Sequence, residues 1–334
     1  MKTNYKTIPK LELHRHLEGA MRLSTIRELA LKEGLLLPYE DERAFRAVFQ
    51  VSPGEERTLV QFLTKFVWLR RLLKNRETLE RITFETVEDA ALDGTRYVEI
   101  RFNYSRLAEN GLSDEEIIGG ICDGVKRAEE MYPIRVGLIC GISRELPVDC
   151  AEKTVDFAIA NQANGIAAID LMNDERFPPA LFGKPFARAR EAGLHITVHA
   201  GEAAGPESVL AAIRELQAER IGHGTHILED PEALRLVAEQ NVFVECCLTS
   251  NVHTGAVPTM CAHPMPVLRM NRIPFCLNTD DPGVSDITLS GEFSVAKESF
   301  GLSEAELRDM QLTAVDYIFR DDLKPWLRSA LCGA

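Results

Sequence analysis

Short apolar segments rich in Val, Ile, Leu and Phe recur along the chain, and longer segments with helical periodicity separate most of them. Short apolar runs are typical of buried strands, and the intervals between these runs are too long for hairpins. The strands are predicted over residues 11–16, 97–102, 134–142, 166–172, 195–200, 220–224, 242–248 and 274–281.

Amphipathic helices are predicted between the strands, for example over residues 113–132 and 206–220. Regular alternation of strand and helix produces a parallel sheet that helices cover, joined by right-handed crossovers. Eight such units predict an α/β protein, a single (β/α)8 TIM barrel. A chain of 334 residues is long enough for two domains, but a barrel accounts for residues 1–334 as one domain.

The connection between the first two strands is longer than the others, about eighty residues with several helical segments and the break SPGEE at 52–56. It predicts a helical insertion over roughly residues 20–92. An insertion after a barrel strand lies at the carboxyl end, where such barrels place active sites, so we expect a lid. Within it, Leu59, Phe62, Leu63 and Phe66 form one apolar stripe, which packs in a core or faces a flat heterocycle.

Charge and cysteine usage narrow the partners and the compartment. The formal charge of −13 disfavours a nucleic-acid polymer or an anionic membrane as partner, but it allows a single nucleoside. No apolar signal segment precedes the first charges, and no apolar run reaches about 18 residues. The eight cysteines contain no CxxC pair, and Cys246 adjoins Cys247, which favours reduced thiols in the core of a cytoplasmic protein.

Three histidines and one aspartate at the ends of predicted strands indicate a metal site. His14 and His16 are two residues apart on the first strand, so both imidazoles project the same way. His199 and Asp280 lie at the ends of the fifth and eighth strands, at the same barrel mouth. An isolated HxH pair is usually fortuitous, but a nitrogen-rich set with one carboxylate favours Zn²⁺ over Mg²⁺ or Ca²⁺.

Further polar residues lie close to these ligands in the sequence. Glu202, in HAGE, can carry a proton between a metal-activated water and a substrate. His223, between two glycines at the end of the sixth strand, can stabilise a hydroxide or an oxyanion. If residues 280 and 281 continue the strand, they point to opposite sides, which frees Asp281 to bind substrate; the structural alternative is a turn or cap.

The other histidines and several absent motifs complete the picture. His195, His226, His253 and His263 are interpreted as structural or rim residues, and His195 as a buried, hydrogen-bonded imidazole far from the mouth. The chain has no HExxH helix, no GxSxG elbow, no P-loop and no GxGxxG after a strand. The HxE…PCxxC pattern of cytidine-type zinc deaminases is also missing.

Six segments resemble, in order and spacing, the motifs of the adenosine deaminase family of the amidohydrolase superfamily. They are PKLELHRHLEGA, FLTKF, TVHAGE, RIGHGTH, TSNVHTGAV and LNTDDP, and they span the whole chain. The resemblance implies one Zn²⁺ per chain and hydrolytic loss of ammonia from C6 of a purine. It implies these roles: zinc ligands His14, His16, His199 and Asp280; proton transfer to ring N1 by Glu202; water orientation by His223; contact with N7 by Asp281.

Two positions depart from the usual pattern of this family. Glu18 stands where nucleoside deaminases mostly carry an aspartate that contacts the ribose 5′-hydroxyl. Asn173, in DLMNDE, stands where DLAGDE has a glycine whose amide donates to N3. Both differences concern the substrate and leave the chemistry unchanged. The implied substrate contacts are therefore Asp281, Asn173, Glu18, His16, Leu59, Phe62, Leu63 and Phe66.

The hypothesis that fits these residues is a deaminase of adenosine and 2′-deoxyadenosine, with a small purine as its partner. The alternative within the class is adenine, a modified adenosine or an adenine nucleotide, since HLEG also occurs in the adenine-specific branch. Two alternatives belong to other functional classes. One is a metal-dependent hydrolase of a non-purine amide or lactone, which would not need Asp281, and the other is an inactive purine-binding barrel. The presence of every expected ligand and proton carrier speaks against the inactive barrel.

Overall fold

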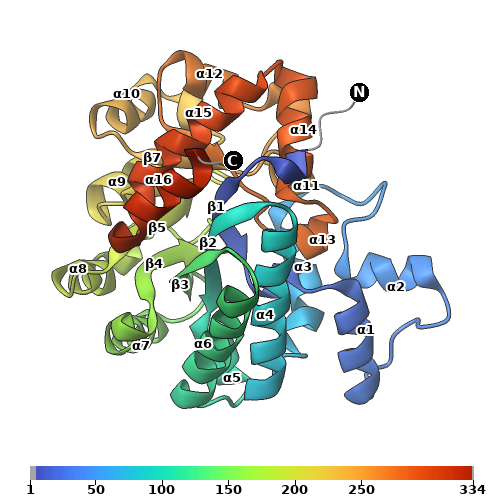
Figure 1. Ribbon diagram of the computed structural model, residues 1–334. Helices are drawn as coiled ribbons and strands as arrows, with labels where there is room; N and C mark the ends of the chain where they lie inside the picture. The colour runs from blue at the N-terminus through green and yellow to red at the C-terminus, as the bar shows by residue number, and fades with distance from the viewer. Residues whose placement is uncertain (1–4, 333–334) are drawn as a thin grey trace.

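The computed structural model describes residues 5–332, and its centre is one sheet of eight parallel strands in sequence order (Figure 1). Each strand pairs with the next through parallel hydrogen bonds. The strands are β1 (Lys10–His16), β2 (Thr95–Asn103), β3 (Arg135–Ser143), β4 (Ile166–Met172), β5 (His195–Ala200), β6 (Arg220–His223), β7 (Phe243–Cys246) and β8 (Phe275–Leu277).

The sheet closes through the residues that follow β8. The amide of Asp280 donates to the carbonyl of His14 at 3.0 Å, and the amide of His16 donates to the carbonyl of Asp280 at 2.9 Å. The (β/α)8 barrel and all eight predicted strands are thus confirmed. The eighth strand ends at Leu277, short of the predicted boundary, because the chain then turns into a left-handed backbone at Asp280.

Helices surround the barrel and cover the outer face of the sheet (Figure 1). Many start with a side-chain cap, such as the Ser113–Glu116 capping box of α6, which satisfies otherwise unpaired amides. The α-helices are α1 (Leu23–Lys32), α2 (Glu42–Phe49), α3 (Leu59–Arg70), α4 (Arg76–Leu92), α5 (Tyr104–Glu109), α6 (Asp114–Met131), α7 (Val148–Ala160), α8 (Gly183–Glu191), α9 (Pro206–Glu215), α10 (Pro231–Glu239), α11 (Leu248–His253), α12 (Met265–Met270), α13 (Pro282–Ser285), α14 (Leu289–Phe300), α15 (Glu304–Ala314) and α16 (Lys324–Cys332).

The long first connection contains the short 3₁₀ helix η2 (Glu18–Ala20) and the helices α1 to α4. α4 packs against β2 and α6, as a barrel helix does, whereas α3 packs against η2 and α2. In Figure 1, α1 and α2 lie outside the ring of barrel helices. The connection therefore brings α3 to the carboxyl end of β1, next to His14 and His16.

Buried charges fill part of the barrel interior. Arg101 pairs with Asp170 at 2.7 Å and with Glu245 at 2.8 Å, and Arg220 pairs with Glu99 at 2.5 Å and with Glu245 at 2.7 Å. Every member is almost completely buried, so each charge depends on its partners. The sequence patterns did not identify this network, because these charges alternate with apolar residues that face the outer helices.

No helix within residues 5–332 is both long enough and apolar enough to cross a membrane. All eight cysteines are free thiols, and Cys246 and Cys247 are buried as expected. Cys261 and Cys332 are exposed, so the expectation of core positions was wrong for these two. Cys261 lies on the 3₁₀ helix η6 (Met260–Ala262) between β7 and β8, and Cys332 is the last residue of α16.

Candidate active site

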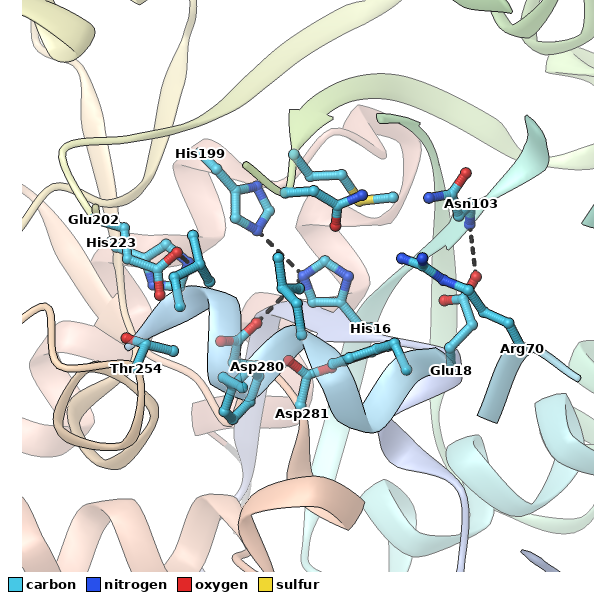
Figure 2. A pocket seen from close by; sticks show the side chains of 16 residues that line it. His16, Glu18, Arg70, Asn103, His199, Glu202, His223, Thr254, Asp280 and Asp281 are labelled. Carbon is cyan, nitrogen blue, oxygen red and sulfur yellow. Dashed lines mark hydrogen bonds and ion pairs between the residues drawn. The ribbon is translucent and has the colours of Figure 1, made fainter. Parts of the chain in front are cut away.

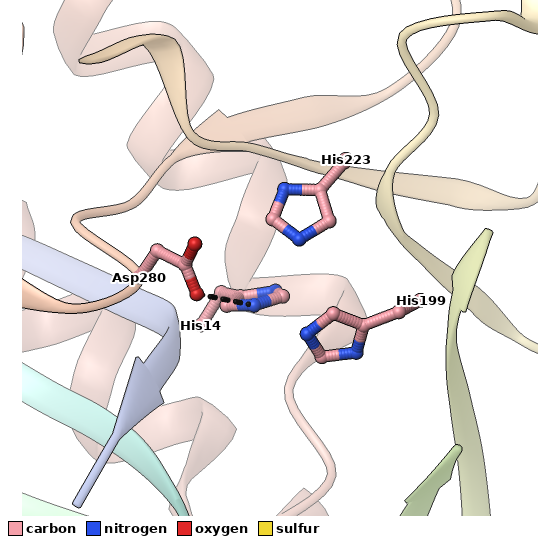
Figure 3. A group of neighbouring side chains, drawn as sticks. All are labelled: His14, His199, His223 and Asp280. Atoms are coloured by element: carbon pink, nitrogen blue, oxygen red, sulfur yellow. Dashed lines mark ion pairs between the residues drawn. The ribbon is translucent and has the colours of Figure 1, made fainter. Parts of the chain in front are cut away.

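Side chains from four separate parts of the barrel meet at the carboxyl end of the strands. His14 ends β1 with His16, His199 lies in β5, His223 ends β6, and Asp280 follows β8. One nitrogen or oxygen atom from each of His14, His199, His223 and Asp280 lies within 4.8 Å of the others (Figure 3). All four side chains are buried, so the predicted convergence occurs.

His16 joins the same centre. Its Nε2 atom is 3.2 Å from Nε2 of His199 and 3.2 Å from Oδ1 of Asp280 (Figure 2). Nε2 of His14 is 3.1 Å from the same oxygen (Figure 3). The centre therefore has five potential donors, one more than a tetrahedral zinc site uses.

Buried carboxylates orient two of the imidazoles. Nδ1 of His14 lies 2.6 Å from Glu245, and Nδ1 of His199 lies 3.1 Å from Asp170. An ionised carboxylate can only accept, so each Nδ1 carries the proton and each Nε2 presents a lone pair to the centre. With its proton on Nδ1, the buried His14 turns the lone pair of Nε2 toward Oδ1 of Asp280, 3.1 Å away. Facing lone pairs without protons between them fit a bound divalent cation.

The protonation states agree with that fit. Burial lowers the pKa of His16 and lowers the pKa of His199 to about 4, so both imidazoles are neutral, as metal ligands must be. Burial opposes ionisation of Asp280, but His14 and His16 hold the pKa of its carboxyl well below the ordinary value. Burial and Arg101 oppose protonation of His14, but Asp280 and Glu245 raise the pKa of this imidazole above its ordinary value, so a bound cation would replace a proton on its Nε2. The site thus combines imidazole nitrogens with one carboxylate and suits a divalent metal.

Glu202 lies beside the centre on a loop that Glu175 holds in place. The Glu175 carboxylate accepts from the amides of Gly201 (2.9 Å), Glu202 (2.8 Å) and Ala204 (2.8 Å). Burial, and then the charges of Asp280 and Glu175, raise the pKa of Glu202 well above its usual value. This environment favours the protonated form of Glu202. Glu175 had not been singled out, because nothing in its local sequence distinguishes it from a surface acid.

Asp281 faces the same pocket as Asp280. The prediction that strand alternation points these two side chains to opposite sides was wrong. The strand ends at Leu277 and Asp280 has φ = 64°, so strand alternation does not apply there. Oδ1 of the buried Asp281 has no partner within the described chain. Burial, and then Asp280, raise the pKa of Asp281 well above its usual value, which makes it a hydrogen-bond donor.

Two glycines allow this close packing. A Cβ atom on Gly19 would lie 1.7 Å from Oδ1 of Asp281, and one on Gly222 would lie 2.9 Å from Cε1 of His14. Real Cβ atoms do not approach so closely, so both positions require glycine. The glycines beside His223 stood out in the sequence, but neither of these two contacts was predicted.

A small pocket adjoins the metal centre. Every predicted site residue except His14 lines it, since His14 lies deeper in the barrel. Further lining residues, which the sequence did not single out, are Arg70, Asn103, Met172 and Thr254. The apolar stripe of α3, formed by Leu59, Phe62, Leu63 and Phe66, borders the pocket.

The two positions that depart from the family pattern both border this pocket. Oε1 of Glu18 accepts from the amide of Asn103 at 2.9 Å. Asn173 has φ = 74°, a region that favours glycine and that asparagine tolerates better than most residues. Its side-chain amide donates to Ser143 at 2.9 Å and to Glu145 at 3.2 Å. The backbone thus keeps a glycine-like conformation although a side chain is present.

The remaining histidines lie outside the centre. His263 is buried, and His226 and His253 bind Glu229 and Ser285. His195 begins β5, far from the mouth as expected, and bonds to Glu219 at 2.8 Å. Its side chain is 34% exposed, so the prediction of a buried imidazole was wrong. The strand starts at the rim of the barrel, where only Phe319 stacks on the ring.

The comparisons with known proteins agree with this site. The adenosine deaminase family model matches residues 9–329. An adenosine deaminase of Shigella flexneri serotype 5b is 39% identical over 315 residues, 94% of each chain. The adenine deaminase of Arthrobacter aurescens has a TM-score of 0.90 at 27% identity, over 98% of each chain. An amidohydrolase structure with bound Zn, from Burkhoderia ambifaria, has a TM-score of 0.89 at 28% identity and covers 99% of this chain and 91% of its own. The chain belongs to the adenosine deaminase family.

Proposed function

We propose that the protein hydrolyses adenosine and 2′-deoxyadenosine to the 6-oxopurine nucleosides and ammonia. The observation that carries this proposal is the centre shared by buried imidazoles and Asp280, with a protonated Glu202 beside it. Membership of the adenosine deaminase family supports the reaction class. The small pocket beside the centre supports a single purine as substrate.

We assign the metal ligands to His14, His16, His199 and Asp280, and the metal to one Zn²⁺ per chain. Borderline-soft nitrogens with one carboxylate favour zinc among the common divalent ions. The solved relative with bound Zn supports the same choice. A zinc ion bound there would supply a Lewis acid that makes hydroxide available at neutral pH.

His223 is left out of the ligand set because a chain of hydrogen bonds places its proton. Nδ1 of His263 accepts from the amide of Met265 at 3.1 Å, so its Nε2 donates to Oδ1 of Asn251 at 3.1 Å. The Asn251 amide then donates to Nδ1 of His223 at 3.0 Å. Burial lowers the pKa of His223 well below its usual value, so the neutral ring carries its proton on Nε2. That N–H can hold the attacking oxygen in position, which is the role we assign.

The other polar residues act on the purine ring. Protonated Glu202 gives its proton to N1 as the oxygen adds to C6, which produces a tetrahedral carbon. The proton of the added hydroxyl then passes to the amino nitrogen, the bond from C6 to that nitrogen breaks, and ammonia leaves as the 6-oxopurine forms. Protonated Asp281 would donate to N7, and the amide of Asn173 would donate to N3.

The apolar residues of α3 and the first connection complete the proposal. Leu59, Phe62, Leu63 and Phe66 would cover the flat face of the purine and exclude water from it. We propose that residues 1–334 form one domain and that the helical insertion over roughly residues 20–92 acts as the lid. The free thiols of all eight cysteines support a cytoplasmic location.

The proposal is tested by adding adenosine to the purified protein and following ammonia release and the ultraviolet change to inosine. Glu202→Gln keeps the shape of the side chain but cannot transfer the proton, so kcat falls by about 10²- to 10⁴-fold. Glu215→Gln, at an exposed position on α9, serves as the matched control and keeps full activity. Unreduced turnover by Glu202→Gln would refute the role of Glu202.

Adenine is the second candidate substrate, because the structure resembles an adenine deaminase and Glu18 replaces the usual aspartate. Comparison of kcat/KM for adenine, adenosine, 2′-deoxyadenosine and N6-substituted adenosines separates the candidates. Asp281→Ala addresses the non-purine alternative, since a hydrolase of another amide does not need the contact with N7.

A further inference from the structure

Arg70, the last residue of α3, brings a positive charge into the pocket. It is the only lysine or arginine among the residues that line the pocket within the described chain. In Figure 2 its guanidinium points into the pocket on the side of Glu18 and Asn103. Glu202 and His223 lie at the opposite end, where the reacting carbon has to be placed.

The guanidinium has few interactions of its own. Its buried Nε has no hydrogen-bond partner within residues 5–332, and its nearest ring contact is Phe66, 5.8 Å from the ring centre. Burial lowers the pKa of Arg70, and Glu18 is the acid that most opposes this shift. One oxygen of Glu18 already accepts from the amide of Asn103. A half-buried cation without a close partner is unfavourable, and a bound anion would relieve it.

Two structural explanations do not account for this arrangement. A positive charge near the end of α3 favours the helix dipole, but the adjacent Arg71 supplies one at an exposed position, 5.0 Å above the Trp68 ring. A structural ion pair does not explain Arg70 either. The nearby carboxylates of Glu109 and Glu145 already bind Arg106, at 2.8 and 2.9 Å. Arg70 therefore retains donors that face the pocket.

We propose that Arg70 binds an anionic group, a carboxylate or a phosphate, at the end of the substrate remote from C6. The preferred substrate is then a 6-aminopurine nucleoside whose sugar carries such a group. A guanidinium matches both anions through paired hydrogen bonds. This inference rests on the proposed function, because it assumes that C6 lies at the metal centre.

The test compares kcat/KM for adenosine, adenosine 5′-monophosphate and adenosine-5′-carboxylic acid. A charged hydrogen bond contributes about 1.5 to 3 kcal/mol, so the wild type should prefer one of the two anionic substrates by about tenfold or more. The anionic substrate with the higher kcat/KM identifies the group that Arg70 binds. Arg70→Met removes the charge and lowers kcat/KM for that substrate about tenfold more than for adenosine, while Arg70→Lys gives an intermediate value.

Arg71→Met is the matched control, because it removes a charge from the next residue outside the pocket and leaves the preference unchanged. Thermal unfolding of each variant checks that the protein folds. If the wild type turns over adenosine as well as, or better than, both anionic substrates, the inference is overturned and the proposed function stands. An equal loss for all three substrates in Arg70→Met also overturns it and indicates a structural role. Turnover of none of the substrates by the wild type overturns both.

Discussion

At the scale of single residues, the active site depends on atoms that nearly touch. The carboxylate of Asp281 lies over Gly19 on η2, which follows β1. Because these residues are 262 positions apart in the sequence, no local pattern reveals the contact. The tight fit explains why a small residue follows Glu18 in this chain.

Gly19→Ala is expected to displace Asp281 and thereby weaken the contact with the purine. The added Cβ would lie 1.7 Å from Oδ1 of Asp281, so the side chain must move. We expect kcat/KM for adenosine to fall by about tenfold or more, the loss of one hydrogen bond to the substrate. Gly183→Ala is the control, because nothing lies within 4 Å of its added Cβ. Full activity of Gly19→Ala would contradict the placement of Asp281.

At the scale of secondary-structure elements, α14 supports the helix that positions His223. Glu292 of α14 accepts from the amide of Thr249 in α11 at 3.0 Å and also binds its hydroxyl. α11 carries Asn251, which contacts His223. Glu292 is almost fully buried, and burial raises its pKa from 4.5 to about 7. The contact between the two helices is therefore sensitive to pH.

The sign of this pH dependence follows from the raised pKa. Between pH 4.5 and 7 the unfolded chain releases the proton of Glu292 while the folded chain retains it, so rising pH favours unfolding. Relative to Glu292→Gln, the wild type should lose about 3 kcal/mol of unfolding free energy over this interval. Urea titrations at several pH values measure the difference. Glu298→Gln, exposed on the same helix, should track the wild type, and a pH-independent difference for Glu292→Gln would contradict the assignment.

At the scale of the whole molecule, the metal centre joins the two ends of the barrel sheet. His14 and His16 end the first strand, and Asp280 follows the last one and pairs with them through its backbone. A ligand that binds only the folded state stabilises it by mass action. Metal binding at this centre should therefore stabilise the barrel as a whole.

Removal of the metal with a chelator should abolish deamination and lower Tm by several degrees, and Zn²⁺ should restore both. At a free concentration of about one hundred times Kd, the ion contributes about 2.7 kcal/mol. Metal analysis should find about one ion per chain in the wild type and in His226→Gln, whose imidazole is remote from the centre. His14→Gln should contain much less. An active protein without metal would contradict the ligand assignment.

Much of this architecture was predictable from the sequence. The apolar segments marked all eight strands, because the face of each strand that packs against the outer helices must be apolar. The strand ends at His199 and His223 also indicated the convergence of the site, since a closed parallel barrel brings all carboxyl ends to one mouth. The exposed Cys332 and the half-buried His195 were mispredicted, because burial at a rim depends on what packs above it.

By itself, the sequence predicted the barrel and the residues that converge at its mouth, because these depend on residue types at regular intervals, and the resemblance of its motifs implied the reaction class. Only the tertiary structure decided which charges are buried together. Glu175 beneath the Glu202 loop, Asn251 beside His223 and Arg70 facing Glu18 come from remote segments. Their roles depend on desolvation and on distances of a few ångströms, which no periodicity encodes.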